Sequence, residues 1–579
     1  MARNLLAKTE LLIIIGLACI PLFIHFPYRV NIFLSWEGAY RISQGQLPFR
    51  DFGTPLGGVY WMIPAIFFKL LGPKMITLVK AQVFINIMAG ICFRSILTSL
   101  SVDKGIRFAS VLLFCLSYSF FNFWPWYNHS VIVYELAALA CLFRYISVTG
   151  AAVVTLTGAG TAVAPGAVSS AATGLASPGA VAAAPGSRWR MAWLAGAGFL
   201  VCLSFLTKQD GGGMAFLLCC GLLACHGFLE GKWAPLGVFA ISFFALLGLL
   251  ILPLLHDGFG YWFNHGQPPH TARVSAFDIV SEFLGASQWI KFYFFLTLVI
   301  VLARWRKLAA LWSDKKTVLL LLLTWGILGE AAIFQITSYT PPDNNIFFHS
   351  FALPCLLTLM APMLPGYFGR PRALILMTVG ILLWWSGIWW KYTQRLAAKI
   401  LPYSTETVSP TGENIVNRMT YMNGAIPPDT TEIPMDKWVE CGLPAFDKIT
   451  MPPPTAAGIH RLMDMPLLKG HNELKLLNMS ELTPLAVEIP YALERNPELP
   501  LWYHLGVGMF NRQAVLLEGR IRDHYYDLVL FEYIPNLNNF YPFRVRDSLR
   551  VHYRLVDSFM APRRGETRGN IEVYVKPTQ

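Results

Sequence analysis

Charged side chains are scarce in this sequence. Only 14% of its 579 residues are Asp, Glu, Lys or Arg, whereas 55% are hydrophobic. A soluble domain usually carries about 25% charged residues. This composition excludes an ordinary water-soluble globular protein and predicts a chain whose main solvent is lipid.

The sequence also lacks the glycine-rich motifs that hold nucleotides. It contains neither a Gly-x-x-x-x-Gly-Lys loop nor a Gly-x-Gly-x-x-Gly fingerprint, so ATP-driven and nicotinamide chemistry are not expected. Histidines and one acid gather at His256, Asp257, His265 and His270, but their spacing follows no zinc motif. We therefore assign no metal ligands and no certain cofactor, and a divalent metal stays possible without a motif that supports it.

Cysteine is almost absent from the last third of the chain. Of the ten cysteines only Cys441 follows residue 400, so that part cannot contain an internal disulfide.

Long apolar runs recur along the first 400 residues. A helix needs roughly 20 mostly apolar residues to cross a bilayer, and we count about eleven such runs. The first lacks a small-residue cleavage site, so we expect a retained helix. The runs lie near Leu11–Pro27, Met75–Ser95, Phe108–Trp124, Val131–Val148, Met191–Thr207, Gly213–Leu229, Pro235–Leu255, Trp289–Ala303, Thr317–Gln335, Phe347–Met363 and Ala373–Trp390.

The basic residues indicate orientation. The net charge is +12, but Lys and Arg fall mainly in short loops, for example at Lys104, Arg107, Arg188 and Arg190, and we do not expect a nucleic-acid partner. These basic residues occur in every second loop between the predicted spans, and loops rich in Lys and Arg usually lie in the cytoplasm. This pattern favours a cytoplasmic N-terminus and an extracytoplasmic, periplasmic C-terminal domain. The predicted location is the cell (inner) membrane, with multiple passes.

Two domains follow from these patterns. Residues 1–400 form a transmembrane domain, in which residues 28–74 are the first external loop with short interfacial helices. Residues 150–188 are rich in Ala, Gly, Val, Pro, Thr and Ser, which predicts a disordered cytoplasmic loop, with a poor helix as the alternative. Residues 401–579 form an extracytoplasmic α/β domain, because Asp527–Phe531 and Ile571–Val575 have the pattern of strands. The fold class is a polytopic α-helical membrane protein with a C-terminal α/β domain.

The first external loop holds a polar motif. We expect a short helix over Trp36–Gln44 that ends at Gly45. One of its faces carries Glu37, Tyr40, Arg41 and Gln44. The Glu37 carboxylate could accept a proton from an attacking hydroxyl, or it could simply form an ion pair with Arg41.

The end of this loop offers a second set of groups. Asp51 could supply another carboxylate, and the Arg50 guanidinium could donate two parallel hydrogen bonds to a phosphate. The alternative is that Asp51 caps the next helix.

Further polar residues stand at the predicted external ends of spans. The Lys208 ammonium is a good partner for a lipid phosphate, although snorkelling to the interface explains it equally well. Gln209 could bind a polar ligand or act as a cap. Asp343 and His349 lie where a second wall of a cleft would stand, and a structural role is the alternative for His349.

The loop motifs resemble those of a known superfamily. Glu-Gly-Ala-Tyr at 37–40 and Gly-Gln-Leu-Pro-Phe-Arg-Asp-Phe at 45–52 resemble the first loop of bacterial C-type (GT-C) glycosyltransferases, which include protein O-mannosyltransferases and lipid A aminoarabinose transferases. Phe205–Asp210 and Tyr127–Ser130 are similar to two further signatures of that group. The chain departs from the pattern at Trp36, where an acid is usual, at Phe49 for Tyr, and at Thr54-Pro55 for paired prolines.

The resemblance implies a GT-C-like fold and an activity. The enzyme would move a sugar from a polyprenyl-phosphate donor to an envelope acceptor on the external face, with inversion, and its partners would be membrane lipid, this donor and the acceptor. The missing first acid leaves Glu37 as the catalytic candidate and weakens a metal role. The substrate-binding set would comprise Tyr40, Asn128, Gln209, Asp343 and His349. A transporter or flippase of a lipid-linked saccharide, or a non-catalytic assembly subunit, is the alternative.

Overall fold

A computed structural model describes most of the chain. The described residues are 2–28, 32–158, 187–257, 262, 276–285, 288–303, 313–337, 347–400, 433–469, 474–489, 491–501, 510–535, 542–563 and 568–577. Asp343 lies outside them.

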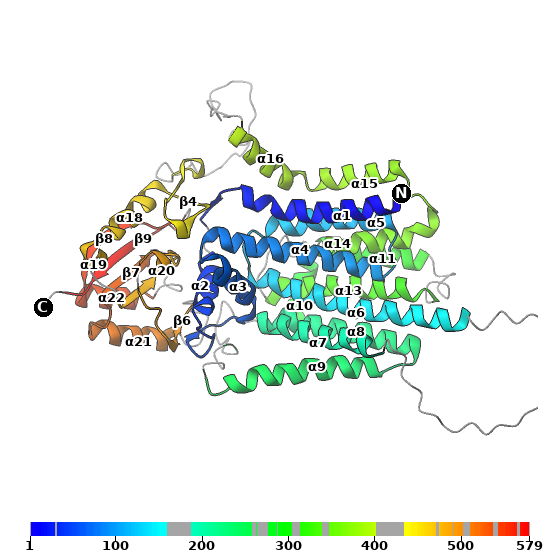
Figure 1. Ribbon diagram of the computed structural model, residues 1–579, viewed down its shortest axis with the longest axis horizontal. Coiled ribbons are helices and arrows are strands. Elements are labelled where there is room, and N and C mark those ends of the chain that lie inside the picture. The colour runs from blue at the N-terminus through cyan, green and yellow to red at the C-terminus, as the bar shows by residue number, and fades with distance from the viewer. Residues whose placement is uncertain are drawn as a thin grey trace, which may run out of the picture.

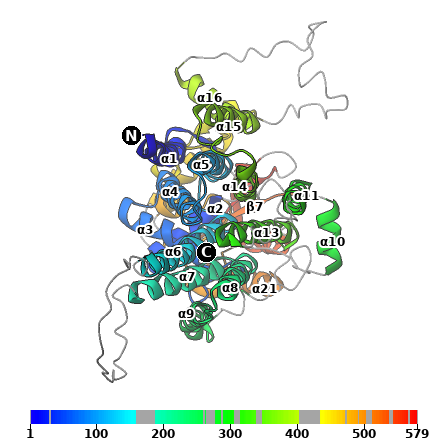
Figure 2. The same cartoon turned by 90° about the vertical axis from the view of Figure 1, so that its right-hand side faces the viewer.

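Long helices form a bundle whose axes run roughly together (Figures 1 and 2). Each predicted apolar run coincides with one of them. They are α1 (Ala2–Cys19), α4 (Met75–Ser99), α5 (Lys104–Tyr118), α6 (Tyr127–Gly158), α7 (Ser187–Thr207), α8 (Gln209–Glu230), α9 (Ala234–Ile251), α11 (Gln288–Ala303), α13 (Lys315–Thr337), α14 (Phe347–Met360) and α15 (Pro371–Trp384). Helices α10 (Ala276–Gly285) and α16 (Ser386–Ile400) flank the bundle.

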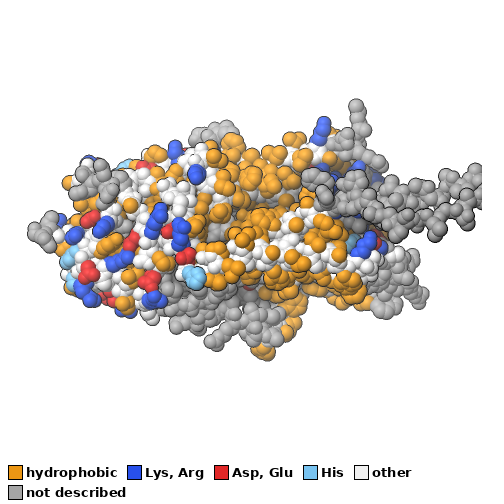
Figure 3. Space-filling model, turned by 60° about the horizontal axis from the view of Figure 1, so that its bottom comes forward, with side chains coloured by type: hydrophobic (Ala, Val, Ile, Leu, Met, Phe, Trp, Pro, Cys, Tyr) orange, Lys and Arg blue, Asp and Glu red, His pale blue; other side chains and the backbone are white. Residues whose placement is uncertain are grey.

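The bundle has the surface of a membrane protein. Within the described ranges, seven helices are long and apolar enough to cross a bilayer, and α11, α14 and α15 are shorter apolar helices. Large hydrophobic side chains face outward, such as Leu217 and Ile241, each 69% exposed. Figure 3 shows hydrophobic side chains covering the bundle, whereas charged ones gather over one end. The prediction of a polytopic α-helical membrane protein is confirmed.

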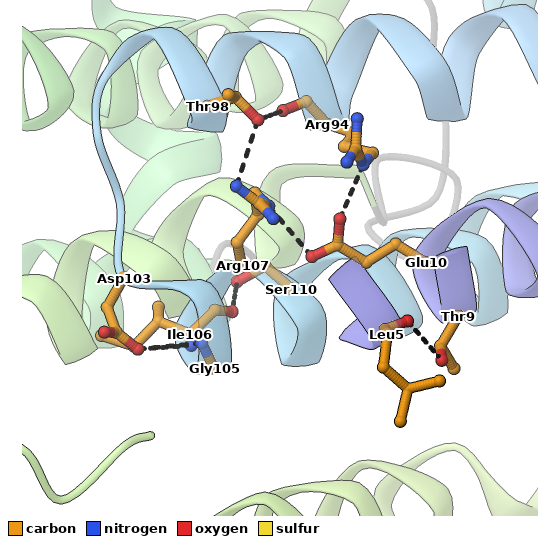
Figure 4. A network of polar contacts seen from close by, with 10 residues as sticks. All are labelled: Leu5, Thr9, Glu10, Arg94, Thr98, Asp103, Gly105, Ile106, Arg107 and Ser110. Atoms are coloured by element: carbon orange, nitrogen blue, oxygen red, sulfur yellow. Dashed lines mark hydrogen bonds and ion pairs between the residues drawn. The ribbon is translucent and has the colours of Figure 1, made fainter. Parts of the chain in front are cut away.

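Helix α1 begins earlier than the predicted run, at Ala2 rather than Leu11, and therefore includes an acid. Glu10 is fully buried, and its two oxygens accept from Arg94 Nε of α4 at 2.6 Å and Arg107 Nε of α5 at 2.9 Å (Figure 4). Two guanidinium groups compensate the one carboxylate, so the charge can lie inside the bundle. The network joins three helices.

Helix α6 also exceeds its expected length. It continues to Gly158, into the segment for which we expect disorder, and α7 begins at Ser187. Residues 159–186 lie outside the described part, so the rest of that prediction stays untested.

The C-terminal region contains the strands that the sequence predicts. A four-stranded sheet has the order β5-β7-β9-β8, and β7 and β9 cover the two predicted strands. Its strands are β5 (Leu476–Met479), β7 (Leu528–Tyr533), β8 (Arg554–Met560) and β9 (Asn570–Val575). Smaller strands are β3 (Val439–Glu440), β4 (Ile449–Met451) and β6 (Asn496–Pro500), and the helices are α18 (Pro453–Met463), α19 (Pro466–Lys469), α20 (Leu485–Glu488), α21 (Phe510–Arg522) and α22 (Phe543–His552).

Strand β7 of this sheet is buried on both faces. Leu528 and Leu530 of β7 join a core shared with the first loop, whereas Val529 and Phe531 point into a second core on the other face. This alternation is the two-residue period of a strand.

The first loop contains β1 (Phe26–Pro27), α2 (Ile32–Ser43), β2 (Phe52–Gly53) and α3 (Met62–Leu71). Helix α2 confirms the existence of the predicted short helix, but it begins at Ile32 rather than Trp36 and ends at Ser43. Gly45 follows it with a positive φ of 82°, which glycine adopts without steric cost. Strand β1 pairs in parallel with β4, and β2 with β6. The loop and the C-terminal region therefore meet at the same end of the bundle, which we call the loop end (Figure 1).

Candidate functional site

Helix α2 presents a buried acid at the loop end. Arg41 Nε and Nη2 both lie 2.9 Å from Glu37 Oε1, and the Glu37 side chain is 17% exposed. Gly38 lies between these two residues in the sequence, and a Cβ added there would lie 2.1 Å from Trp61. Helix α2 can therefore pack against the Trp61 ring only with glycine at this position. The i, i+4 ion pair that the sequence leaves as an alternative is thus present, and a base role for Glu37 stays a prediction.

The C-terminal region closes over this pair. Arg41 Nη1 donates to the Glu494 carbonyl at 3.1 Å, Gln46 Nε2 to the Leu493 carbonyl at 3.0 Å, and the Tyr40 hydroxyl to the Ala486 carbonyl at 3.3 Å. Tyr40 therefore faces the C-terminal region. No local sequence pattern signals these contacts, because their partners lie more than 400 positions away.

Burial sets the electrostatics of Glu37. It raises the pKa of the Glu37 carboxyl, and the Arg41 charge and hydrogen bond oppose this without cancelling it. Burial also raises the pKa of the Tyr491 phenol, and the neighbouring Glu37 carboxylate adds to that rise. Glu37 is therefore a stronger base than an ordinary glutamate.

Asp51 does not cap the next helix. Its Oδ2 accepts from the Leu47 N–H at 2.8 Å and from Arg50 Nη2 at 2.7 Å, so it closes the turn that precedes β2. Burial acts to raise the pKa of Asp51, but the hydrogen bonds from Arg50 and Leu47 outweigh it, and the pKa is lowered. These contacts favour a structural role for Asp51, and the Arg50 guanidinium is engaged with it.

Lys208 occupies the break between α7 and α8. Its extended backbone (φ −156°, ψ 122°) separates the two helices, and its Nζ lies 2.9 Å from Asp210 Oδ2 and 4.6 Å from the centre of the Phe334 ring. The side chain is only 13% exposed, so it does not snorkel to the surface. An ammonium between a carboxylate and an aromatic face is held in place by both.

The first loop packs directly on this break. A Cβ added at Gly57 would lie 1.8 Å from the Leu206 carbonyl oxygen. The Tyr60 ring lies 6.1 Å from that of Tyr127 at the start of α6, which in turn lies 6.0 Å from Lys208 Nζ. The loop, the start of α6 and Lys208 therefore adjoin.

The remaining predicted residues have separate surroundings. Gln209 Nε2 donates to the Trp262 carbonyl at 3.1 Å, and Asn128 Oδ1 is buried without a hydrogen-bond partner in the described part of the chain. His349 is 5% exposed and its Nδ1 lies 2.7 Å from the Tyr293 hydroxyl, inside a cluster of aromatic rings. This cage favours the structural alternative for His349. Among the residues described, no three His, Cys, Asp or Glu side chains are placed to hold a metal ion.

The structure also places two acids that the sequence analysis missed. Glu135 of α6 and Glu330 of α13 are buried inside the bundle and act on each other. An acid within an apolar run is a sequence signal for function, but the pairing of these two depends on how α6 and α13 pack.

Comparison with known proteins finds a structural likeness. No family model matches the chain, and no curated protein matches its sequence. The chain is similar to the crystal structure of ArnT from Cupriavidus metallidurans bound to undecaprenyl phosphate, with 11% identity, a TM-score of 0.46, and coverage of 98% of this chain and 97% of that one. A likeness at this level carries no argument about chemistry, which rests on the residues above.

Proposed function

We propose that this chain is an integral membrane glycosyltransferase that moves a sugar from a polyprenyl-phosphate donor to an envelope acceptor at the loop end, on the external face. One observation carries the proposal. The first loop, with its Glu-Gly-Ala-Tyr motif, packs through Gly57 onto the helix break that holds Lys208. A buried base and a cation beside the lipid are the two groups that such a transfer needs.

The reaction balances with these groups. An acceptor hydroxyl oxygen bonds to the anomeric carbon while the bond from that carbon to the phosphate oxygen breaks, which inverts the centre. Glu37 takes the hydroxyl proton, and its raised pKa suits a base. The leaving polyprenyl phosphate keeps the electron pair, and Lys208 neutralises its charge. Both contacts from Arg41 end on Oε1, so Oε2 stands outside the ion pair.

Substituting Lys208 tests the donor site. We expect Lys208→Met to weaken binding of a polyprenyl phosphate by roughly tenfold or more, because a charged hydrogen bond contributes about 1.5 to 3 kcal/mol. Binding of the free sugar should change little. Isothermal titration with purified protein in detergent measures both.

Lys232→Met is the matched control, because Lys232 lies beyond the far end of α8 and is exposed. It should bind the polyprenyl phosphate like the wild type. Equal losses of lipid and sugar binding in Lys208→Met would assign this lysine to folding and would contradict the donor site.

One observation favours a second candidate, a flippase of lipid-linked saccharides. Transporters place paired acids inside the bundle, and Glu135 with Glu330 is such a pair. Proteoliposomes that hold a fluorescent lipid-linked sugar decide between the two: a flippase moves the label across the bilayer without any acceptor, and a transferase consumes it only when an acceptor is present.

A further inference from the structure

The intramembrane acids have no role in the transfer reaction above. Glu135 and Glu330 are 1% and 4% exposed. Oε1 of Glu135 and both carboxyl oxygens of Glu330 have no hydrogen bond of good geometry within the described part of the chain, although the two carboxyl groups are close enough to act on each other. A buried charge without a compensating partner has a high free energy, so these carboxyl groups must bind a proton or another cation.

Helix geometry points the two carboxyl groups at one place. A Cβ added at Gly211 of α8 would lie 2.6 Å from Phe334 Cζ and 2.9 Å from Val131 Cγ2, so α6 and α13 converge on α8 there (Figure 2). Glu135 stands one turn from Val131, and Glu330 one turn from Phe334, each on the same face of its helix and further from the loop end. Gly211 itself is nearly one turn from Lys208, so both acids lie about two turns beneath the Lys208 break.

The two acids extend a line of interacting charged groups that begins at Lys208, and we call this line the column. Asp210 pairs with Lys208, and Glu330 acts on both of them. The Cys219 thiol of α8, which is fully buried, faces the two acids at the inner end of the column. Among the described residues, Tyr127 is a further titratable neighbour, on which Asp210 acts.

We propose that Glu135 and Glu330 form a proton-binding site, in which one proton is shared between the two carboxyl groups and a second is taken up when an anion binds at Lys208. Two adjacent carboxylates cannot both ionise inside a bundle. With one shared proton, the column of Lys208, Asp210 and the pair carries a net charge of minus one, which repels a lipid phosphate. A second proton removes that charge, so proton binding and phosphate binding strengthen each other.

This inference rests on the proposed function only for Lys208 as the partner of the phosphate. The probe is the methyl diester of a short polyprenyl phosphate, because a phosphate monoester itself titrates near neutral pH. We expect its affinity for the wild type to fall on the order of tenfold as the pH rises through the titration of the pair, the effect of a unit charge about 10 Å away at an effective dielectric constant of about 20.

Neutral variants isolate the pair. Gln keeps the size of each side chain and removes its charge, so in the double variant Glu135→Gln, Glu330→Gln binding should become independent of pH and stay at the tight, acidic level. Each single variant keeps one carboxyl group that still titrates but loses the shared proton that stabilises the monoanion, so its affinity should fall at a higher pH than that of the wild type. The single variants serve if the double variant does not fold. Glu230→Gln, which removes an acid at the far end of α8 where it pairs with Lys315, should titrate like the wild type.

The outcomes separate the two proposals. If Lys208→Met binds the diester as well as the wild type does, the donor site of the proposed function fails. If Lys208→Met weakens binding but the Gln variants keep the wild-type pH dependence, the proton site alone is overturned. Infrared spectroscopy of the wild type gives an independent readout: we expect a carboxylic-acid C=O band at neutral pH that both Gln variants alter, and a wild type without such a band contradicts the shared proton.

Discussion

At the scale of single residues, Glu37 combines two properties that an exposed glutamate lacks. It is shielded by the C-terminal region, and Arg41 fixes the direction of its carboxylate through Oε1. A base that is already oriented loses little entropy when the acceptor arrives. The same ion pair also makes Glu37 part of the local structure, so a test of its chemistry must preserve its shape.

Glu37→Gln meets that requirement. We expect turnover to fall by roughly 10²- to 10⁴-fold with a modest change in donor affinity, because general-base catalysis contributes about that much. Initial rates with saturating donor, together with the melting temperature, measure the effect. Asp51→Asn is the companion variant. Because Asp51 closes a turn through Leu47, we expect its main effect to be a lower melting temperature, with little loss of turnover. A catalytic loss in Asp51→Asn alone would transfer the base role to Asp51.

The pH dependence of transfer follows from the same residue. A base must be deprotonated to act, so activity is present above its pKa and is lost as the pH falls through it. Because burial raises the pKa of Glu37 despite Arg41, the acidic limb of the kcat/KM profile should lie above the range of an ordinary glutamate. Arg41→Gln removes the group that lowers this pKa and should move the limb further toward neutral pH. A limb that stays in place in this variant would argue against Glu37 as the titrating group.

At the scale of elements, the first loop packs closely on the α7–α8 break because residue 57 is a glycine, which has no side chain. Gly57→Ala places a Cβ 1.8 Å from the Leu206 carbonyl oxygen, so either the loop or the helix end must shift. We expect a loss of about 1 to 3 kcal/mol in the free energy of unfolding, as for an overpacked core, together with weaker binding of the polyprenyl phosphate. Denaturant unfolding and the lipid titration measure the two effects.

Gly213→Ala, in the first turns of α8 after the break, is the control. Nothing lies within 4 Å of a Cβ added there, and alanine favours a helix over glycine by up to about 1 kcal/mol. The two substitutions should therefore change stability in opposite directions. A Gly57→Ala protein as stable as the wild type would contradict the tight seat of the loop.

The elements also show which parts of the fold are visible in the sequence. The apolar runs predict the helices because a bilayer requires each span to satisfy its own backbone, and Gly45 marks the end of α2 because a positive φ suits glycine. The start of α1 was misplaced because Glu10 interrupts the apolar pattern, and the arginines that compensate it come from α4 and α5. Pairings of this kind depend on tertiary packing, which no local window contains.

At the scale of the whole molecule, the orientation in the membrane stays a prediction from the basic loops. The N-terminal end of α1 and the C-terminal region lie at opposite ends of the bundle (Figure 1). Lys576→Cys places an exposed thiol near the C-terminus, and we expect an impermeant maleimide to label it in intact cells after the outer barrier is permeabilised. Lys104→Cys, at the start of α5, should react only after lysis. The reverse pattern would place the loop end in the cytoplasm.

The parallel pairing of β1 with β4 and of β2 with β6 has a consequence for biosynthesis. Phe26 pairs with Ile449, and Phe52 with Asn496, so roughly 400 residues separate the partners. Contacts between residues so far apart in the sequence form late in folding. The first loop leaves the ribosome long before the strands that complete it exist. During that interval the helices can insert one after another, while α2 still lacks the cover that buries Glu37. The candidate site is therefore complete only when the last quarter of the chain has reached the loop end. If Glu37 is the base, we expect a nascent chain in the membrane to stay inactive until its synthesis is complete.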